Sequence, residues 1–474
     1  FELRKADREH MVSGFGAGVP RRTCGRARRV RIRGRTFGHV GVANVERRAG
    51  DSEGKDLFVP RGRTDLGAAG GPTGRLGKWS MADGAKARPL KLVVVHSIPS
   101  PYRLHLFAAL SQACKRSGIQ FRVEFMAKEH QDRKHWAFRK QDAGFTYRFW
   151  QDVGPMAGGR RWHWNPELLR ELCRECPEFL MVGGIWDSVT GAALTASKPC
   201  GALLSWIEGN ARQMGRTSGV VGRVKRLLMT MPDAFVVPGG VGEDFIRAYE
   251  VGRSRRPVLR LPNLVDERRF QPQGQAGREQ ARKELGILGG RRVALWPARL
   301  IPEKGILEFL ASIELEDFAG GSVLLVGDGP LRGRIQAEIE RRALASVFEL
   351  RPSVPYEQMP NLYWAADLFL LPSIRDQNPL SVVEALHAGL PLLLSGMAGN
   401  ADEALTDERN GWRLDPSNRS GVRKVIREAF TADRSELDRM GAISRTVGAK
   451  RWGSEEAAKA FVEAILRRVG QGLA

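Results

Sequence analysis

Cysteine is scarce in this 474-residue sequence, and its few cysteines form no regular pattern. A fold held by disulfides would need more of them at recurrent spacings. Cys173 and Cys176 form a C-x-x-C, but they lie in a helical pattern, and no second ligand pair stands at the spacing of a zinc site. We expect ordinary thiols at Cys24, Cys114, Cys173, Cys176 and Cys200.

Long apolar runs are also missing, and so are the usual metal motifs. No segment offers 18 uninterrupted apolar residues, and the first residues lack the basic, apolar and small-residue zones of a secretory leader. We therefore expect a cytoplasmic protein, with contact to the inner face of the plasma membrane left open. The sequence contains no Asp-x-Asp and no His, Cys and carboxylate cluster at metal spacing, so no metal site is predicted.

Acidic residues are too few to balance the basic ones, but the excess is uneven. The net charge is +22, and residues 1–80 carry 18 Lys and Arg against 8 Asp and Glu, a surplus of 10. Nearly half of the excess therefore lies in about a sixth of the chain. This weakens the hypothesis that the whole protein binds nucleic acid, a partner that we do not expect.

Residues 1–80 differ from the rest of the chain. They are rich in Arg and Gly, show neither helical nor strand periodicity, and open on Phe1. Met81 then leads through a short polar stretch into an apolar strand. We favour Met81 as the true start, with a non-native or disordered extension before it. The competing hypothesis is a basic arm that touches anionic lipid or nucleic acid. A transit peptide fits less well because the segment carries several acids.

From Lys91 onward, short apolar runs alternate with amphipathic segments of helical length. This pattern predicts a parallel sheet covered on both faces. The strands expected in the first half are Lys91–His96, Arg122–Met126, Phe179–Val182, Ala202–Ile207 and Ala234–Val237. The helices expected there are Tyr102–Arg116, Pro166–Arg174 and Gly242–Tyr249, and Arg256–Phe270 supplies a last strand and a hinge.

The alternation restarts in the second half. Its expected strands are Arg292–Trp296, Ser322–Val326, Phe348–Arg351, Leu368–Leu371 and Leu392–Ser395. Its expected helices are Glu303–Ser312, Pro330–Arg342, Tyr356–Ala365, Ser381–Ala388, Ala401–Thr406 and a final Ser454–Arg468. We predict an α/β protein with two doubly wound, Rossmann-like domains, 81–270 and 271–450, facing a central cleft. Residues 451–474 should form a helix that packs back towards the first domain.

The segment PARLIPEKG follows the first strand of the second half. Pro302 suits a helix start, Gly305 permits close backbone approach, and Arg299 and Lys304 flank the expected helix N-terminus. Free N–H groups beside two cations suit a diphosphate. Solvated surface charges explain the two cations about equally well.

The next strand ends in VGDGPL. Gly327 and Gly329 predict a tight turn before the following helix. Because this turn is common between strands and helices, contact of either glycine with a phosphate or ribose is the weaker interpretation.

A third segment, LPSIRDQNPLSVVEALHAGLP, carries two acids eight residues apart. Asp376 lies in the loop and Glu384 in the first turn of the expected helix, so both could point into one cleft. A carboxylate accepts two neighbouring hydroxyls, which suits a ribose and a sugar. Turn and helix-dipole preferences explain either acid alone, but not both in this context.

The half from about Arg291 onward resembles the retaining GT-B glycosyltransferases of family 4. PARLIPEKG is similar to the family's R-x4-K-G loop, VGDGPL to its Gly-Asp-Gly turn, and IRDQNPLSVVEALHAGLP to its E-x7-E segment. The block Gly399–Leu414 resembles the one that follows. The first half is compatible but carries weaker signals. The resemblance implies the GT-B fold and transfer from a UDP- or GDP-sugar, without a metal or other cofactor, to a glycan, lipid-linked or other hydroxyl acceptor.

The resemblance also implies roles for individual residues. Arg299 and Lys304 would bind the donor diphosphate and stabilise it as a leaving group. Glu384 would hold the ribose hydroxyls, and Asp376 the hydroxyls of the transferred sugar. Backbone N–H groups near Leu380 and Ser381 would meet the phosphates.

Two departures affect the choice of donor sugar. The first acid of the E-x7-E segment is Asp376, one methylene shorter than Glu, and Pro379 stands where the family usually has Gly, which removes a backbone donor.

The acceptor half offers fewer signals. Glu208 follows the strand ALLSWIEGN, about where relatives often carry a functional His, and is our candidate acceptor-side contact or proton relay; a structural carboxylate fits as well. The basic stretch Arg212–Met229 could lie on an anionic membrane or be a solvated helix face. A group of aromatic and basic residues could meet sugar rings or lipid, although ordinary packing is favoured. Its members are Trp136, Trp150, Trp162, Trp164, Arg139, Arg148, Arg160 and Arg161.

Two alternatives stay open at this point. Within enzymes, a GT-B nucleotide-sugar epimerase or a phosphorylase would share the fold. From another class, a basic nucleic-acid-binding protein would show salt-sensitive binding that survives deletion to Met81.

Overall fold

The computed structural model describes residues 89–128, 143–157, 160–184, 188–209, 219–249, 256–287, 289–406 and 409–469. The chain divides into two units, 1–80 and 81–474, and all that follows concerns the second. The hypotheses about residues 1–80 fall outside the described residues, as do those about Trp136, Arg139 and the start of the basic stretch.

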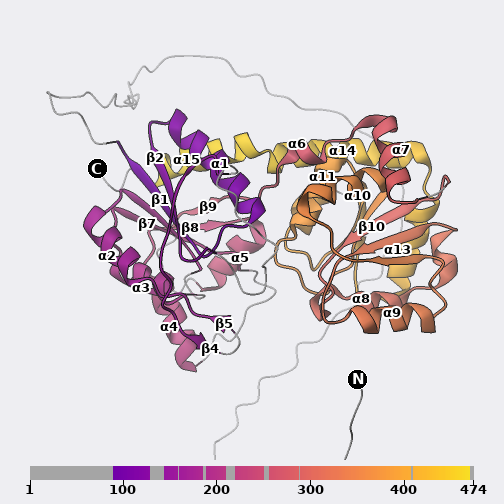
Figure 1. Cartoon of the computed structure of the whole chain (residues 1–474), viewed down its shortest axis with the longest axis horizontal. Coiled ribbons are helices and arrows are strands. Elements are labelled where there is room, and N and C mark those ends of the chain that lie inside the picture. The colour runs from indigo at the N-terminus through magenta and orange to yellow at the C-terminus, as the bar shows by residue number, and fades with distance from the viewer. Residues whose placement is uncertain are drawn as a thin grey trace, which may run out of the picture. The chain divides into compact units, whose positions relative to one another are not determined.

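A seven-stranded parallel sheet forms the core of the N-terminal domain, with the strand order β3-β2-β1-β6-β7-β8-β9 (Figure 1). The strands are β1 (Lys91–His96), β2 (Gln120–Phe125), β3 (Thr146–Phe149), β6 (Phe179–Gly183), β7 (Ala202–Trp206), β8 (Ala234–Val237) and β9 (Val258–Arg260). A separate two-stranded hairpin joins β4 (Met156–Ala157) to β5 (Arg160–Arg161).

Continuous apolar runs build this sheet because both of its faces are buried. Along β1, Leu92 and Val94 enter one hydrophobic cluster, while Val93 and Val95 enter the other. Successive side chains of a strand point to opposite faces, so an unbroken apolar run fits a sheet covered on both sides. The covering helices are α1 (Pro101–Arg116), α2 (Pro166–Glu175), α3 (Val189–Ser197), α4 (Gly219–Met229) and α5 (Gly240–Tyr249).

The C-terminal domain repeats this design with six parallel strands in the order β12-β11-β10-β13-β14-β15. They are β10 (Val293–Pro297), β11 (Ser322–Val326), β12 (Phe348–Arg351), β13 (Leu368–Leu371), β14 (Leu392–Ser395) and β15 (Gly411–Leu414). Since β10 pairs with both β11 and β13, the strand order reverses between β10 and β13. In doubly wound sheets, ligands bind beyond the carboxyl ends of the strands at such a reversal.

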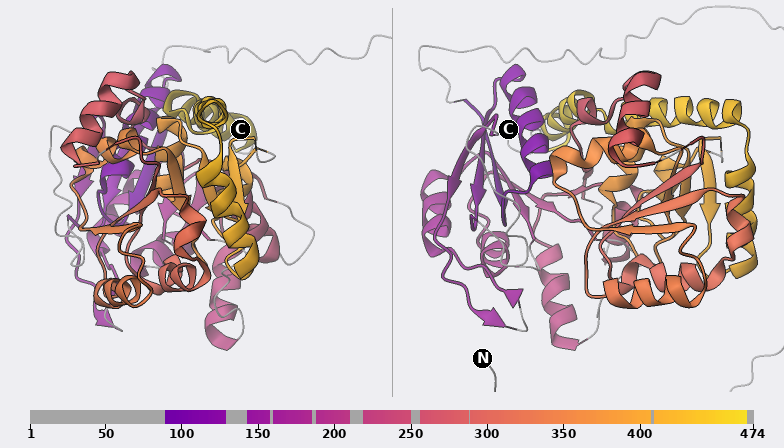
Figure 2. Two further views of the ribbon diagram at one scale, coloured as in Figure 1. Left: turned by 90° about the vertical axis from the view of Figure 1, so that its right-hand side faces the viewer. Right: turned by 45° about the vertical axis from the view of Figure 1, so that its right-hand side comes forward.

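Helices cover both faces of the second sheet, as the two views of Figure 2 show. The helices of the C-terminal domain are α6 (Glu267–Phe270), α7 (Gly274–Glu284), α8 (Ile306–Ser312), α9 (Arg332–Arg341), α10 (Met359–Ala365), α11 (Leu380–Ala388), α12 (Ala401–Ala404), α13 (Arg419–Thr431) and α14 (Arg434–Trp452).

The last helix, α15 (Ser454–Arg468), packs on α1 of the N-terminal domain. His105 Nε2 lies 2.7 Å from Ser454 Oγ, and Arg116 donates to Glu455 at 2.9 Å. These contacts join the chain's last helix to its first domain.

The predicted fold class is confirmed, and the predicted strands agree with the structure to within two residues. Two predicted helices are wrong in detail. The segment Tyr356–Ala365 is a 3-10 turn, Tyr356–Gln358, followed by α10. The segment Glu303–Ser312 is a 3-10 turn, Pro302–Lys304, followed by α8, because Gly305 takes a left-handed φ of 65° between them. No helix in the described part of the chain combines the length and the apolar content needed to cross a bilayer.

Candidate functional site

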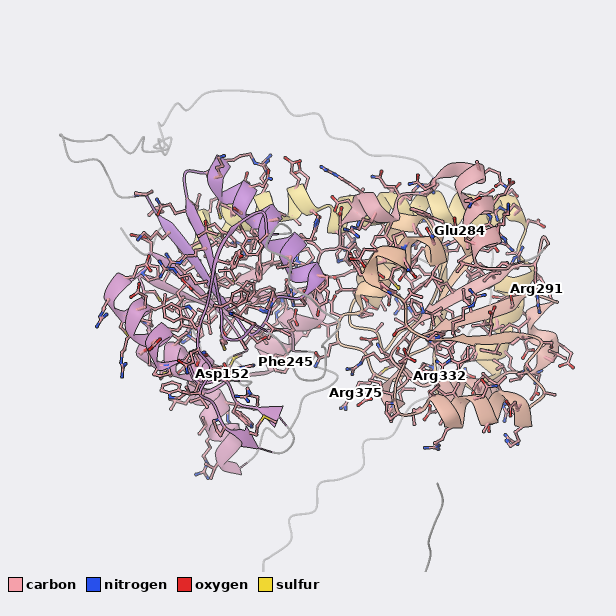
Figure 3. The ribbon with its side chains drawn as sticks, in the orientation of Figure 1. Asp152, Phe245, Glu284, Arg291, Arg332 and Arg375 are labelled. Atoms are coloured by element: carbon pink, nitrogen blue, oxygen red, sulfur yellow. The ribbon has the colours of Figure 1, made fainter. Side chains whose placement is uncertain are left out.

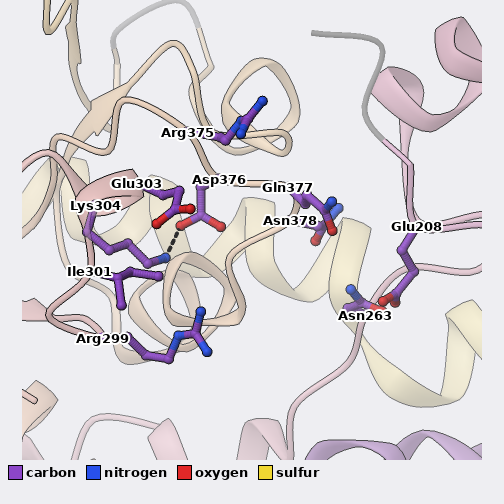
Figure 4. Close-up of a pocket in the computed structure, with 10 residues that line it drawn as sticks. All are labelled: Glu208, Asn263, Arg299, Ile301, Glu303, Lys304, Arg375, Asp376, Gln377 and Asn378. Atoms are coloured by element: carbon purple, nitrogen blue, oxygen red, sulfur yellow. Dashed lines mark hydrogen bonds and ion pairs between the residues drawn. The ribbon is translucent and has the colours of Figure 1, made fainter. Parts of the chain in front are cut away.

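A cavity of about 640 Å³ lies at the strand reversal of the C-terminal sheet (Figure 4). Loops that follow β10 and β13 form most of its wall, and two residues that follow strands of the N-terminal sheet complete it. Nearly all of the lining side chains are polar: Glu208, Asn263, Arg299, Ile301, Glu303, Lys304, Arg375, Asp376, Gln377 and Asn378. Arg299, Lys304, Asp376 and Glu208, the residues predicted to be catalytic, are therefore together in one cavity.

Lys304 and Asp376 form an ion pair inside this cavity (Figure 4). Only 17% of the Lys304 side chain and 11% of the Asp376 side chain are exposed. The family resemblance implies that the two residues bind different parts of a donor, whereas here each is the partner of the other. A phosphate entering the cavity would therefore compete with Asp376 for the lysine.

Two close contacts explain why these two loops meet, and a third holds the loop that carries Asp376. A Cβ on Gly305 would lie 2.9 Å from Ile374 Cγ2 and 3.1 Å from the carbonyl oxygen of Pro372, so only glycine allows this approach. The N–H of Arg375 donates to the Glu303 carbonyl at 2.9 Å. Beyond them, the N–H of Gly399 donates to the Asp376 carbonyl at 3.0 Å. The loop that carries Asp376 is thus fixed from both sides.

Arg299 is an exposed cation of the cavity, as Arg375 is, and its guanidinium has no hydrogen bond or ion pair in the part of the chain described. Its loop is held by the backbone on both sides, since Ala298 N donates to Val326 O at 3.0 Å and Leu300 N donates to Asp328 O at 2.9 Å. The backbone is therefore positioned while the guanidinium stays available for an anion.

Gly327 and Gly329 line no part of the cavity; they support the Arg299 loop. A Cβ on Gly327 would lie 1.9 Å from the carbonyl oxygen of Ala298, and one on Gly329 2.5 Å from that of Leu300. Arg332 also donates to the Gly327 carbonyl, at 3.1 Å (Figure 3). The structural explanation of this turn, which the sequence analysis favoured, accounts for both glycines.

Leu380 and Ser381 open helix α11 directly after the cavity-lining loop. Their N–H groups find no backbone acceptor among the described residues, as is usual in the first turn of a helix. Asn400 Nδ2 donates to the Pro379 carbonyl at 3.0 Å and so holds the start of the helix. The two N–H groups therefore remain available as donors to an anion.

Glu384 does not lie where the sequence predicted. It is the fifth residue of α11 rather than a first-turn residue, and it is buried outside the lining of the cavity. Tyr363 donates a hydrogen bond of 2.6 Å from its hydroxyl to the Glu384 carboxylate. Burial raises the pKa of Glu384 to about 7, although the Tyr363 hydrogen bond opposes the shift. Asp376 lines the cavity, whereas the Glu384 carboxylate is directed towards Tyr363 on α10, so the two acids do not point into one cleft in this structure.

Glu208 comes from the N-terminal domain and forms an ion pair with Arg103. Arg103 is buried, donates to Asn263 Oδ1 at 2.8 Å, and lies 4.3 Å from the centre of the Trp206 ring. Burial would raise the pKa of Glu208, but the charge of Arg103 and its hydrogen bond outweigh burial and lower it. Glu208 thus faces the cavity as a carboxylate.

His96 shares this environment at the end of β1, against the rings of Phe107 and Trp206. Burial, together with the charge of Arg103, lowers the pKa of His96 to about 4. A neutral imidazole therefore accompanies the charged pair.

Sequence reasoning missed several residues that line the cavity. Arg375 and Asn378 flank Asp376 in the same loop, and Asn263 lies in the Pro-Asn turn that was predicted only as a hinge. The position of Arg375 and Asn378 after β13, at the order reversal, could have identified these two, whereas Asn263 follows the edge strand β9. The side-chain amides of Asn263 and Asn378 carry no charge, so a search for charged residues does not find them.

One group of three potential metal ligands occurs among the described residues, away from the cavity: His105, Asp266 and Glu267. It combines α1 with the start of α6, so no sequence spacing could reveal it. Ser454 Oγ donates to Glu267, and His105 Nε2 lies 3.5 Å from that carboxylate. His105 and Glu267 therefore bind the first residue of α15, which gives this group a structural role.

A family model matches the C-terminal domain of the chain, and individual proteins match longer stretches. Residues 277–447 match the family model described as glycosyl transferases group 1. A 2-deoxystreptamine N-acetyl-D-glucosaminyltransferase from Streptomyces fradiae is 31% identical over 243 residues, which are 50% of this chain and 57% of that protein. A 2-deoxystreptamine glucosyltransferase from Streptomyces kanamyceticus is 24% identical over 287 residues, 58% of this chain and 70% of that one.

Solved structures share the architecture over a longer stretch. Anabaena HepE in complex with UDP and glucose superposes with a TM-score of 0.62 over 80% of this chain and 100% of its own, at 14% identity. WaaG, a glycosyltransferase involved in lipopolysaccharide biosynthesis, gives 0.56 over 78% and 99%, at 17% identity. At these identities the likeness establishes the fold, which is GT-B.

Proposed function

We propose that this chain is a glycosyltransferase that moves a sugar from a nucleoside diphosphate sugar to a hydroxyl acceptor, with retention of anomeric configuration and without a metal ion. The observation that carries the proposal is the group Arg299, Lys304 and Asp376 in one polar cavity at the strand reversal. The match of this domain to glycosyl transferases group 1 supports the same activity.

The cations of the cavity have a specific task in such a reaction. As the glycosidic bond breaks, negative charge develops on the departing diphosphate, and one well-placed donor lowers the barrier by about 3–4 kcal/mol. Arg299 would bind the diphosphate first, because its guanidinium is free. Lys304 would then exchange Asp376 for a phosphate oxygen, and the N–H groups of Leu380 and Ser381 would add neutral donors.

Release from Lys304 gives Asp376 a second task. Its carboxylate can then accept hydroxyl groups of the transferred sugar. Glu384 would hold the ribose only after its hydrogen bond with Tyr363 is rearranged. This requirement follows from its burial in α11.

Three cations line the cavity, which supports chemistry without a metal. Arg299, Lys304 and Arg375 supply fixed positive charge close to Asp376, and by resemblance the phosphate oxygen itself takes the acceptor's proton. Glu208, from the other domain, would orient the acceptor hydroxyl. Glycan and lipid-linked hydroxyls are the acceptor classes, and 2-deoxystreptamine is a third candidate because two similar proteins are named for it.

A donor panel tests the proposal. The full-length protein is incubated with UDP- and GDP-sugars, with each acceptor class and without acceptor, and nucleotide release is measured. The anomeric configuration of the product is then read by NMR. We expect release that depends on acceptor for one donor, and a product that keeps the donor's configuration.

Other outcomes would contradict the proposal. Donor turnover to an isomeric sugar without acceptor would indicate an epimerase, and phosphate-dependent cleavage of a glycan would indicate a phosphorylase. A product with inverted anomeric configuration would support a glycosyltransferase but would contradict the retaining mechanism.

A further inference from the structure

Exposed apolar side chains gather in one part of the N-terminal domain. Of the ten large apolar side chains that are exposed in the described residues, seven lie between Val153 and Leu227: Val153, Met156, Trp162, Val189, Val220, Val224 and Leu227. Scattered single residues of this kind are normal on a surface, whereas a concentration marks a contact region.

Helix α4 carries three of them on one side. Val220, Val224 and Leu227 are spaced by four and three residues, which places them on a single helical face, and they are 74%, 50% and 58% exposed. Met229, near the end of the helix, is buried. A surface helix usually turns its apolar stripe towards the core, and α4 turns one outward.

Basic residues accompany this stripe, and acidic residues are absent from it. Arg223 and Arg226 are exposed on α4. The sequence from Gly209 to Pro232 contains five cations and no acid: Arg212, Arg216, Arg223, Lys225 and Arg226. A helix that joins an outward apolar face to exposed cations has the composition of a helix that lies in a membrane interface.

The β4–β5 hairpin repeats the combination. Val153 and Met156 are exposed beside Arg161, and the sequence from Val153 to Pro166 has no acid. Asp152 fixes the base of the hairpin, because its carboxylate accepts the N–H groups of Gly154 at 2.9 Å and Trp164 at 3.0 Å (Figure 3). The exposed apolar residues are thus carried on a fixed element.

Helix α4 and the hairpin project from the same end of the N-terminal domain. Figure 1 and both views of Figure 2 share a vertical axis, and in all three the two elements reach the lower edge of the domain. We propose that this end docks on a bilayer that contains anionic phospholipid, with Val220, Val224 and Leu227 inserted among the headgroups and acyl chains and Arg223 and Arg226 on the phosphates.

Charge complementarity favours a bilayer as the occupant. Cations without intervening acids suit a continuous anionic surface, and each one near such a surface strengthens binding about fivefold. Two separate projections at one end can also reach a flat surface together. The inference is independent of the proposed sugar transfer, although a docked domain would suit a lipid-linked acceptor.

Vesicle sedimentation of the full-length protein tests the proposal. Wild type is compared on phosphatidylcholine vesicles and on vesicles that also contain phosphatidylglycerol. We expect Val220→Ser with Val224→Ser and Leu227→Ser to weaken binding to the mixed vesicles at least tenfold. Arg223→Gln with Arg226→Gln should weaken it about 30-fold and should matter less as salt rises. Residues 1–80 are the same in every variant, so their charge cannot produce the difference.

Matched controls remove similar groups elsewhere. Leu315→Ser deletes an exposed leucine of the C-terminal domain, and Lys424→Gln with Arg467→Gln deletes two exposed cations. Both should bind as wild type does, and circular dichroism checks that all variants fold. Unchanged binding by both α4 variants would overturn the proposal. So would self-association in the ultracentrifuge that the serine variant abolishes while vesicle binding stays, because α4 would then contact a second copy.

Discussion

The Lys304 ammonium and the Asp376 carboxylate form an ion pair that joins two loops 72 residues apart in sequence. Each belongs to a different strand connection at the order reversal of the C-terminal sheet. The pair holds the two side chains in place before any ligand arrives. A donor diphosphate would release Asp376 by taking its partner, so binding of the phosphates and freeing of the sugar-facing carboxylate would be one event.

Replacing Lys304 tests the leaving-group role. We expect Lys304→Ala to lower kcat at least 10²-fold, because the developing phosphate charge would lose a donor. Steady-state kinetics with the accepted donor measure the loss, and circular dichroism checks the fold. Lys424→Ala, which removes an exposed lysine elsewhere, is the control. Turnover close to wild type in the Lys304 variant would remove the lysine from the mechanism.

Variants of Arg299 and Arg332 distinguish a residue that binds the donor from one that supports the loop. Arg299→Ala should raise the donor KM at least tenfold and leave the Tm unchanged, since the guanidinium has no partner among the described residues. Arg332→Ala should lower the Tm, because its side chain donates to the carbonyls of Gly327 and Arg351. Thermal unfolding and donor titration distinguish the two. A lower Tm for the Arg299 variant would show that it supports the fold.

Local sequence signals were sufficient for most strands of the two sheets and for the loops that line the cavity, although β3 and β15 were not predicted. The apolar runs predicted β10 and β13, and the polar residues after each strand then had to meet, because parallel strands end at the same edge. This is why Arg299, Lys304 and Asp376 could be predicted to lie together. Which of them would pair could not be predicted, because the pairing depends on how closely Gly305 lets the loops approach.

The misplacement of Glu384 has a different cause. The Glu384 carboxylate is directed towards Tyr363 on α10, and no local pattern signals this contact between residues 21 apart. The exposed stripe of α4 had a sequence signal, but exposure is a tertiary property.

Glu384 makes stability depend on pH. Burial raises its pKa from 4.5 to about 7, so the folded state holds a proton that the unfolded state releases. The stabilisation is present below the unfolded pKa and is lost as pH rises through 7, by up to about 3 kcal/mol. Wild type should therefore lose Tm relative to Glu384→Gln between about pH 5 and about pH 8. Parallel curves for the two proteins would contradict the shift.

Tyr363→Phe is the companion variant to Glu384→Gln. The Tyr363 hydrogen bond lowers the pKa of Glu384, so its loss should raise that pKa further and steepen the decline of stability towards alkaline pH. His387 is buried with a lowered pKa, which acts in the opposite direction and costs stability as pH falls. Since His387 is present in all three proteins, the differences between their curves isolate the carboxyl group.

Arg103 should matter for the fold as well as for Glu208. It is buried and bonded to both Glu208 and Asn263, so Arg103→Met leaves a carboxylate and an amide without their donor. Because 42% of the Glu208 side chain is exposed, water can solvate part of that charge, and we expect a loss of about 1–3 kcal/mol. Urea unfolding measures it. Arg116→Met, at an exposed pair on the same helix, should cost less than about 1 kcal/mol.

Metal removal tests the source of positive charge at the leaving group. Arg299, Lys304 and Arg375 already supply three cations to the cavity, so turnover of the accepted donor should be the same with excess EDTA as with added Mg²⁺. The Lys304→Ala variant sharpens the test, because a metal can partly replace a missing cation on a diphosphate. We expect Mg²⁺ to restore part of the activity of that variant. It should not raise the activity of wild type, because the wild-type cavity already has all three cations. Loss of wild-type turnover in EDTA, reversed by one divalent metal, would instead show that the protein's own cations are insufficient and that the diphosphate needs an ion beside Asp376.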